Sequence, residues 1–425
     1  MENFIEFFAF QNPNVLYVVL GMLCINSSSA LIGTFAYLRK RSLIGDAIAH
    51  SLLPGICIGF LFAGEKNIIY LLGGAFVSGW VSIFLIDYIV NHSRIKQDTA
   101  IGIVLSSFFA LGIVLLTFIQ KSGNGNQAGL DHFLFGQAAA ITRQEIIIFF
   151  IIFLIILITV ILFYRSLLLI SFNPEFAASI GLPVRIFEFV LTSLTVLAIA
   201  AGIQALGVIL MSALIITPAA AARLWTHQLK FLIVLAILFS VFSGVFGAYI
   251  SFSKTGMPTG PWVVVILSSI TIISMLIAPN RGILSRYLLK LRNSKKITDE
   301  NILKAIYSHF EGNSVSENHQ FTLRSLTEIR QFDTSTLNRG INRLLRKKYL
   351  LKESDELFIT TAGLIESKRI VRLHRLWEQY LLKRTSIDKD HVHSGAEAIE
   401  HIITPEIEKE LERELNIKGI PKEDY

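Results

Sequence analysis

Two groups of side chains in this sequence have the chemistry to bind a transition-metal ion. In the first group, Asp46 and His50 interrupt a long apolar segment. Their spacing of four residues places both on one face of a helix. A carboxylate and an imidazole suit Mn²⁺, Zn²⁺ or Fe²⁺. Because ionisable groups in apolar helices are costly and usually face a path or a partner, the pair is predicted to line an ion path. The alternative is that the pair only caps or pins helices.

The second group lies near the end of the chain. His374 and Glu378 repeat the spacing of four residues, and further imidazole and carboxylate side chains follow at His393, Glu397, Glu400 and His401. On helices, these spacings bring several of the side chains onto a common face. Mixed clusters of this kind suit Mn²⁺, Fe²⁺ or Zn²⁺. They predict a second metal site, with a chance array of surface Glu and His as the alternative.

The composition divides the chain into two parts, and each part must supply the helices that position one of the two groups. Hydrophobic residues make up 52% of the 425 residues, which is high for a soluble protein. The last 145 residues nevertheless hold 48 of the 71 charged residues. We therefore expect residues 1–280 to form a membrane domain and the remainder to be soluble. The net charge of +7 fits basic cytoplasmic loops and anionic partners.

The apolar part predicts an all-α polytopic domain with eight or nine transmembrane helices. A span needs about 20 apolar residues. The candidate segments are 15–37, 43–63, 68–90, 98–119, 144–170, 186–203, 205–222, 231–252 and 262–278. Basic residues favour the cytoplasmic side, and they predict an external N-terminus and a cytoplasmic C-terminal domain.

Residues 281–296 are predicted to form a basic juxtamembrane linker. Its positive charge could rest on anionic membrane lipid. Positive-inside topology alone would explain the same charges.

Residues 297–363 predict a winged helix-turn-helix domain. We expect a helix at Ile297–Phe310 with Thr298 as its N-cap, helices at 322–331 and 334–349, and a β-hairpin near 349–360. In such a fold the second helix of the motif enters the DNA major groove. The side chains expected to contact DNA are Ser335, Thr336, Arg339 and Arg343. Use of the domain for protein contacts alone is the alternative. Residues 364–425 are expected to form a helical metal-binding and dimerisation segment.

Four segments of the apolar part carry distinctive motifs: Gly45–Gly55, Asn173–Pro183, Leu206–Ala219 and Gly256–Pro261. Together they resemble the integral-membrane permease of ABC importers for zinc, manganese or iron, over about residues 12–280. The resemblance implies a homodimer, a separate ABC ATPase and an extracytoplasmic metal-binding protein. It implies that Asp46 and His50 are ion ligands in the path. It also implies that the helix containing Glu175, Ala178 and Gly181 couples to the ATPase.

Residues 297–416 resemble the metal-dependent repressors of the diphtheria toxin repressor and manganese transport regulator family. The matching segments include Ile302–Tyr307, Ile359–Gly363, His374–Glu378 and Val392–His401. The resemblance implies that His374, Glu378, His393, Glu397, Glu400 and His401 are metal ligands. Glu397 stands where manganese-type members carry Glu. Asn301 and Lys304 stand where family members donate further ligands, so we expect one metal site to be incomplete.

The sequence therefore predicts a permease subunit of a bacterial inner- or plasma-membrane importer for Mn²⁺, Zn²⁺ or Fe²⁺. Its cytoplasmic repressor-like domain would regulate transport or transcription. The chain has no G-x-x-x-x-G-K-[ST] motif, so it is expected to be a transport subunit without ATPase activity. The alternative is a membrane-anchored, metal-dependent transcription regulator whose apolar half is an anchor or receptor.

Overall fold

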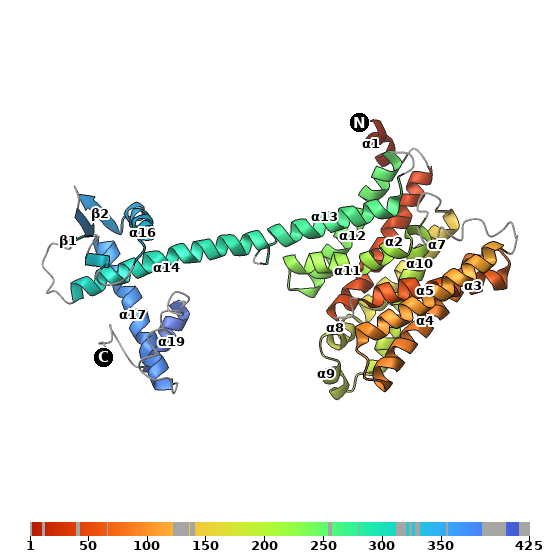
Figure 1. Ribbon diagram of the computed structural model, residues 1–425, viewed down its shortest axis with the longest axis horizontal. Helices are drawn as coiled ribbons and strands as arrows, with labels where there is room; N and C mark the ends of the chain where they lie inside the picture. Colours follow the sequence, from red (N-terminus) through yellow and green to blue (C-terminus); the bar gives the residue numbers. More distant parts are fainter. Residues whose placement is uncertain are drawn as a thin grey trace. The chain divides into compact units, whose positions relative to one another are not determined.

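The chain folds into two compact units, Met1–Ser285 and Arg286–Tyr425, which are described separately (Figure 1). The computed structural model describes residues 2–10, 13–39, 43–65, 67–121, 136, 141–253, 257–279, 281–311, 320–322, 325–327, 332–353, 356–384 and 405–415.

The first unit is entirely helical in its described residues. Eight of its helices are long and apolar enough to cross a membrane. They are α2 (Pro13–Leu38), α3 (Ile44–Ala63), α4 (Ile68–His92), α5 (Gln97–Lys121), α7 (Arg143–Leu162), α10 (Val184–Leu206), α12 (Leu229–Ser253) and α13 (Thr259–Ile277). The predicted segment at 205–222 corresponds to α11 (Val208–Trp225), a shorter apolar helix that contains Pro218. The short α1 (Glu2–Phe8) precedes them all.

The span predicted at 144–170 is present but ends earlier than expected. The structure divides this segment into α7, which ends at Leu162, and α8 (Tyr164–Phe172). Phe163 separates them with φ −105° and ψ 17°, outside the helical region. The nearly unbroken apolar composition of α7 ends here, and α8 begins with Tyr164 and Arg165.

Small residues bring the helices of the first unit close together around α3. A Cβ atom on Gly33 of α2 would lie 2.0 Å from the Ile215 carbonyl oxygen of α11, and one on Gly55 would lie 2.1 Å from the Gly74 carbonyl oxygen of α4. Such close backbone approach is typical of membrane helix packing. Large apolar side chains remain exposed elsewhere on the unit, among them Phe84, Phe118 and Ile161, as expected of a surface that faces lipid.

The second unit combines helices with a small antiparallel sheet. Its elements are α14 (Ile283–Glu311), β1 (Gln320–Phe321), α16 (Thr334–Arg346), β2 (Leu350–Glu353), β3 (Glu356–Ile359), α17 (Thr361–Arg384) and α19 (Pro405–Leu415). The strand order is β1-β3-β2, and Leu350 pairs with Ile359 in the β2–β3 hairpin. The apolar face predicted for α16 is buried against α14 and the sheet, at Leu337, Ile341 and Leu344.

Thr298 is not an N-cap, contrary to the sequence prediction. α14 begins fifteen residues earlier, at Ile283, and passes through position 298 without a break. The Thr298 hydroxyl donates to the Ser294 carbonyl oxygen at 2.9 Å, as threonine does inside a helix. No proline or glycine lies between Ile283 and Glu311, so nothing in this segment stops the helix. Of the helix predicted at 322–331, residues 325–327 are helical in the described part of the chain.

Candidate metal path and regulatory unit

Asp46 and His50 lie on one face of α3, as predicted. His50 Nε2 is 3.5 Å from Asp46 Oδ1, which is an ion-pair distance when the imidazole is protonated. The Asp46 side chain is 40% exposed and the His50 side chain 23%. His50 Nδ1 is buried and makes no hydrogen bond within the described part of the structure. Solvent therefore reaches both side chains of the pair, although the unpaired His50 Nδ1 is itself buried.

Side chains from two other helices surround the pair. The edge of the Phe109 ring of α5 meets the His50 ring at a centroid separation of 5.1 Å. The Ser212 hydroxyl of α11 hydrogen-bonds to the Asp46 carboxylate. Gly45 of α3 packs against Ile215 of α11, where a Cβ atom would make an ordinary contact at 3.4 Å from Ile215 Cγ2. The packing of α3 between α5 and α11 thus sets the position of both ionisable groups.

Pro54 lies four residues after His50, inside α3. Proline has no N–H, so it cannot donate the usual helical hydrogen bond to the His50 carbonyl oxygen. The proline therefore interrupts the hydrogen-bond ladder of α3 one turn after His50.

The predicted ATPase-coupling helix is α9 (Pro174–Ser179), and Glu175, Ala178 and Gly181 are all exposed. The Asn173 side chain accepts a hydrogen bond from Phe176 N at 3.0 Å and caps the first turn. Gly181, with φ 86°, ends the helix. The amides of Gly181 and Leu182 donate to the carbonyls of Ala178 and Ala177, which is a Schellman ending.

The surface of α9 is apolar as well as exposed. Phe176 is 51% exposed and Ile180 is 55% exposed, while Ala177 is buried and fixes the helix to the unit. Two exposed apolar side chains on a firmly capped short helix form a surface suited to docking a protein partner.

In the second unit, His374 and Glu378 are brought together on α17. His374 Nε2 is 2.8 Å from Glu378 Oε1, and the side chains are only 4% and 6% exposed. Their donor chemistry fits a transition metal. The other predicted ligands (His393, Glu397, Glu400 and His401) lie outside the described residues. Within the described ranges, no group of three or more His, Cys, Asp or Glu side chains could hold a metal ion. Asn301 and Lys304 lie half-buried on α14.

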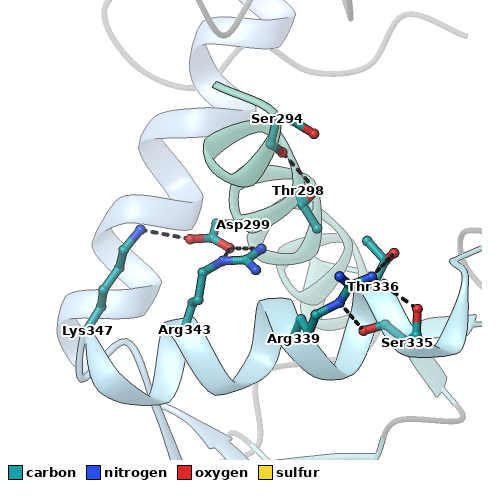
Figure 2. A network of polar contacts seen from close by, with 8 residues as sticks. All are labelled: Ser294, Thr298, Asp299, Ser335, Thr336, Arg339, Arg343 and Lys347. Atoms are coloured by element: carbon teal, nitrogen blue, oxygen red, sulfur yellow. Dashed lines mark hydrogen bonds and ion pairs between the residues drawn. The ribbon is translucent and has the colours of Figure 1, made fainter. Parts of the chain in front are cut away.

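The residues predicted to contact DNA lie along α16, where three of the four form a local network (Figure 2). The hydroxyls of Ser335 and Thr336 donate to the Asp333 carboxylate at 2.6 and 3.0 Å. These hydrogen bonds, with the Ser335 bond the strongest, hold the pKa of Asp333 below its ordinary value. Arg339 Nε donates to the Ser335 carbonyl oxygen at 3.1 Å. Ser335 and Arg339 remain exposed, and Thr336 is half-buried.

Arg343, the fourth predicted DNA contact, faces α14 instead. Its Nε and a terminal guanidinium nitrogen lie 2.8 Å from Asp299 Oδ1, and Lys347 Nζ lies 2.8 Å from Asp299 Oδ2 (Figure 2). The Asp299 side chain is 5% exposed. A buried carboxylate needs such partners, and the two cations tie α16 to α14.

The sequence did not single out Ser212, Phe109 or Asp299. Ser212 lies within a motif segment, and a hydroxyl in an otherwise apolar helix was a weak signal of its own. Phe109 carries no polar group that could have identified it. In the sequence, Asp299 resembles an ordinary acidic residue on a helix surface. It is buried only because α16, a distant helix, packs against it.

Comparison with known proteins finds a matching family in each of the two units. Residues 11–278 match the ABC 3 transport family, and residues 360–417 match the family described as iron dependent repressor, metal binding and dimerisation domain. The manganese transport system membrane protein MntC of Bacillus subtilis is 39% identical over 373 residues, covering 88% of this chain and 85% of that protein. This similarity extends beyond the 285 residues of the first unit.

Two further similarities concern mainly the first unit. The zinc transport system membrane protein TroC of Treponema pallidum is 42% identical over 275 residues, which is 65% of this chain and 92% of that protein. The solved structure of PsaBC from Streptococcus pneumoniae in complex with Fab matches with a TM-score of 0.60 and 33% identity, covering 68% of this chain and 99% of that one. With eight helices among the described residues that are long and apolar enough to cross a membrane, and a C-terminal match to the iron dependent repressor family, the chain is a multi-pass membrane protein that belongs to the ABC 3 transport family.

Proposed function

We propose that this chain is the permease subunit of an ABC importer for a divalent transition metal, with Mn²⁺ as the favoured substrate over Zn²⁺ and Fe²⁺. One relative that is similar over both units is named a manganese transport system membrane protein. The oxygen atoms of the Asp46 carboxylate and of the neighbouring Ser212 hydroxyl favour a hard ion.

The observation that carries the proposal is the partly exposed Asp46–His50 pair in the first two turns of α3, which packs between α5 and α11. Ionisable groups in an apolar helix cost desolvation free energy and usually face a path or a partner. The partial exposure of both side chains supports exchange with a passing ion. A path ligand must bind the ion and then release it.

The proposed partners follow from the family and from α9. ATP hydrolysis comes from a separate ABC ATPase that docks on the Phe176 and Ile180 side chains of α9. An extracytoplasmic metal-binding protein delivers the ion, and two copies of this chain form the permease. The second unit lies in the cytoplasm of a bacterial cell.

For the second unit we propose a winged-helix fold that responds to metal through His374 and Glu378 together with His393, Glu397, Glu400 and His401. The β2–β3 hairpin would be the wing, and α16 the recognition helix. Because Arg343 is engaged by Asp299, the exposed cation at the start of α16 is Arg339. We favour direct regulation of transport, with DNA binding through Ser335, Thr336 and Arg339 as the second candidate.

Transport is tested with the Asp46→Ala variant, reconstituted with its ATPase in proteoliposomes. Removal of a metal ligand should lower ATP-driven Mn²⁺ uptake by about 100-fold, at the upper end of losses seen when metal-site partners are removed. Asp98→Ala, which removes an exposed carboxylate at the start of α5, is the matched control and should transport normally. Undiminished uptake by Asp46→Ala would refute the proposed path.

The role of the second unit is tested by gel retardation with the full chain in detergent. DNA binding would be established if the chain retards operator DNA only when Mn²⁺ is present and this retardation is lost in Arg339→Ala. Absence of retardation at saturating Mn²⁺, together with uptake that slows as internal Mn²⁺ rises, would establish direct regulation of transport.

A further inference from the structure

We propose that the first three turns of α14 form an amphipathic helix that binds the anionic phospholipid surface of the membrane. The apolar residues concerned, here called the α14 stripe, are Ile283, Leu284, Tyr287, Leu288 and Leu291. This inference concerns a lipid site and does not depend on which metal the first unit carries.

The α14 stripe is a single exposed apolar face. Its members are spaced by one, four, five and eight residues from Ile283, which places them on one side of a helix. Each is between 40% and 58% exposed in the folded chain. Five large apolar side chains side by side are more than the scattered exposure that is normal for a soluble surface. The stripe therefore requires an apolar surface to cover it.

The opposite face of the same turns carries basic side chains around one exposed leucine, Leu289. Arg286, Lys290 and Arg292 lie on the side away from the α14 stripe or at its margins, and Lys296 follows one turn later. No Asp or Glu occurs between Arg281 and Thr298, so the first three cations have no acidic residue within one turn, whereas Lys296 pairs with Glu300 at 3.6 Å. An apolar stripe beside basic side chains is a feature of helices that lie in the membrane interface.

The start of α14 is fixed at the end of the apolar helices. Arg281 donates to the Arg223 carbonyl oxygen at 3.2 Å and contacts His227 Nδ1 at 3.0 Å, both at the end of α11. The Ser285 hydroxyl reaches the Ile277 carbonyl oxygen of α13 at 3.5 Å. These contacts, all made within the first unit, hold the start of α14 at the ends of the apolar helices α11 and α13.

A second copy of this chain is a poorer occupant than lipid. Pairing of two stripes would bring Arg286, Lys290 and Arg292 of both copies together, six cations with no acidic residue in the paired segment to offset them, whereas stable helix pairs use flanking charges of opposite sign. The stripe also ends at Leu291, since Ser294 and Lys295 occupy the positions that would continue it. It is shorter than the three to four heptads that a coiled coil uses. A phospholipid surface offers both the acyl boundary and the negative charge.

The test measures the depth of nitroxide labels on the full chain in nanodiscs. Leu288→Cys places a label on the stripe and Arg292→Cys places one on the basic face, both in a Cys24→Ser, Cys57→Ser background. Lys409→Cys on α19 is the control in an exposed, water-facing position. Power saturation compares contact with dissolved oxygen, which concentrates in acyl chains, with contact with a water-soluble nickel chelate. Nanodiscs contain phosphatidylcholine with or without phosphatidylglycerol.

With phosphatidylglycerol present, we expect the label at position 288 to favour oxygen and the labels at 292 and 409 to favour the nickel chelate. Reversal of the four cations to Glu should move the label at 288 towards the nickel chelate while the protein still elutes as a single species. Equal nickel contact at 288 and 409 in anionic nanodiscs would overturn the proposal. So would strong spin–spin broadening at 288, because it would show that a second copy covers the stripe.

Discussion

Two acid–histidine pairs with identical spacing occupy different surroundings in this protein. In the first unit, Asp46 and His50 are 3.5 Å apart and their side chains are 40% and 23% exposed. In the second unit, His374 and Glu378 are 2.8 Å apart and almost fully buried. The same sequence pattern thus gives an open pair among apolar helices and a closed pair inside a charged unit. Spacing places two side chains on one face, but the neighbouring helices decide whether an ion can reach them.

The difference matches what each pair is proposed to do. A transport ligand must be reached from two sides and must release its ion, so an open and loosely joined pair is suitable. A regulatory ligand can be buried, because it only has to respond to metal at equilibrium. Each of the following variants changes one of the two units and leaves the other as it is.

The largest effect is expected from Gly33→Val, which attacks the packing that holds α11 beside the open pair. A Cβ atom at this position would lie 2.0 Å from a backbone oxygen that cannot move aside alone. Overpacking usually costs about 1–3 kcal/mol, and a clash with backbone belongs at or above the upper limit. The variant should fail to give a monodisperse peak in size-exclusion chromatography. Gly73→Val is the matched control, since no atom lies within 4 Å of its Cβ position.

The second unit should respond to Asp299→Asn, which weakens the buried ion pairs with Arg343 and Lys347. Hydrogen bonds to charged groups contribute about 1.5–3 kcal/mol, so a loss of about 2 kcal/mol should raise local opening of α16 by about 30-fold. Hydrogen exchange of the α16 amides in the full chain measures this change.

Glu300→Gln is the neighbouring control for Asp299→Asn. Its carboxylate pairs with the more exposed Lys296 at 3.6 Å, so exchange in α16 should hardly change. Equal acceleration in both variants would show that Asp299 has no special role in holding α16.

A smaller effect is expected from Ser212→Ala, which removes the hydroxyl that contacts Asp46. Groups that orient a metal ligand typically change metal affinity or activity by 10- to 100-fold, and we expect about a 10-fold lower rate of Mn²⁺ uptake at limiting concentration. Ser269→Ala on α13 removes an exposed hydroxyl that bonds only to its own helix, and it should leave uptake unchanged. Unchanged uptake in Ser212→Ala would show that Ser212 of α11 does not contribute to the ion path.

Local patterns in the sequence predicted several elements well. The cap at Asn173-Pro174 and the Gly181 ending predicted α9, because caps depend on neighbouring residues only. The helical period predicted the buried face of α16 at Leu337, Ile341 and Leu344. The Asp46–His50 face followed in the same way from spacing.

Features that depend on distant segments could not be predicted. Ser212 and Phe109 come to the open pair from helices far away in the sequence, and only packing brings them there. Thr298 looked like a cap because a threonine before acidic residues often starts a helix, yet the helix was already formed upstream. Arg343 was predicted to contact DNA, but in the structure its guanidinium group pairs with Asp299.

The most direct test of the account compares His50→Ala with His374→Ala in the same transport assay. Both variants are reconstituted with the ATPase in proteoliposomes free of internal metal, and the initial rate of ATP-driven Mn²⁺ uptake is measured. His50→Ala should lose uptake by about 100-fold, as expected for removal of a path ligand, whereas His374→Ala should keep the wild-type rate. Normal uptake by His50→Ala, or equal loss in both variants, would contradict the assignment of the open pair to transport.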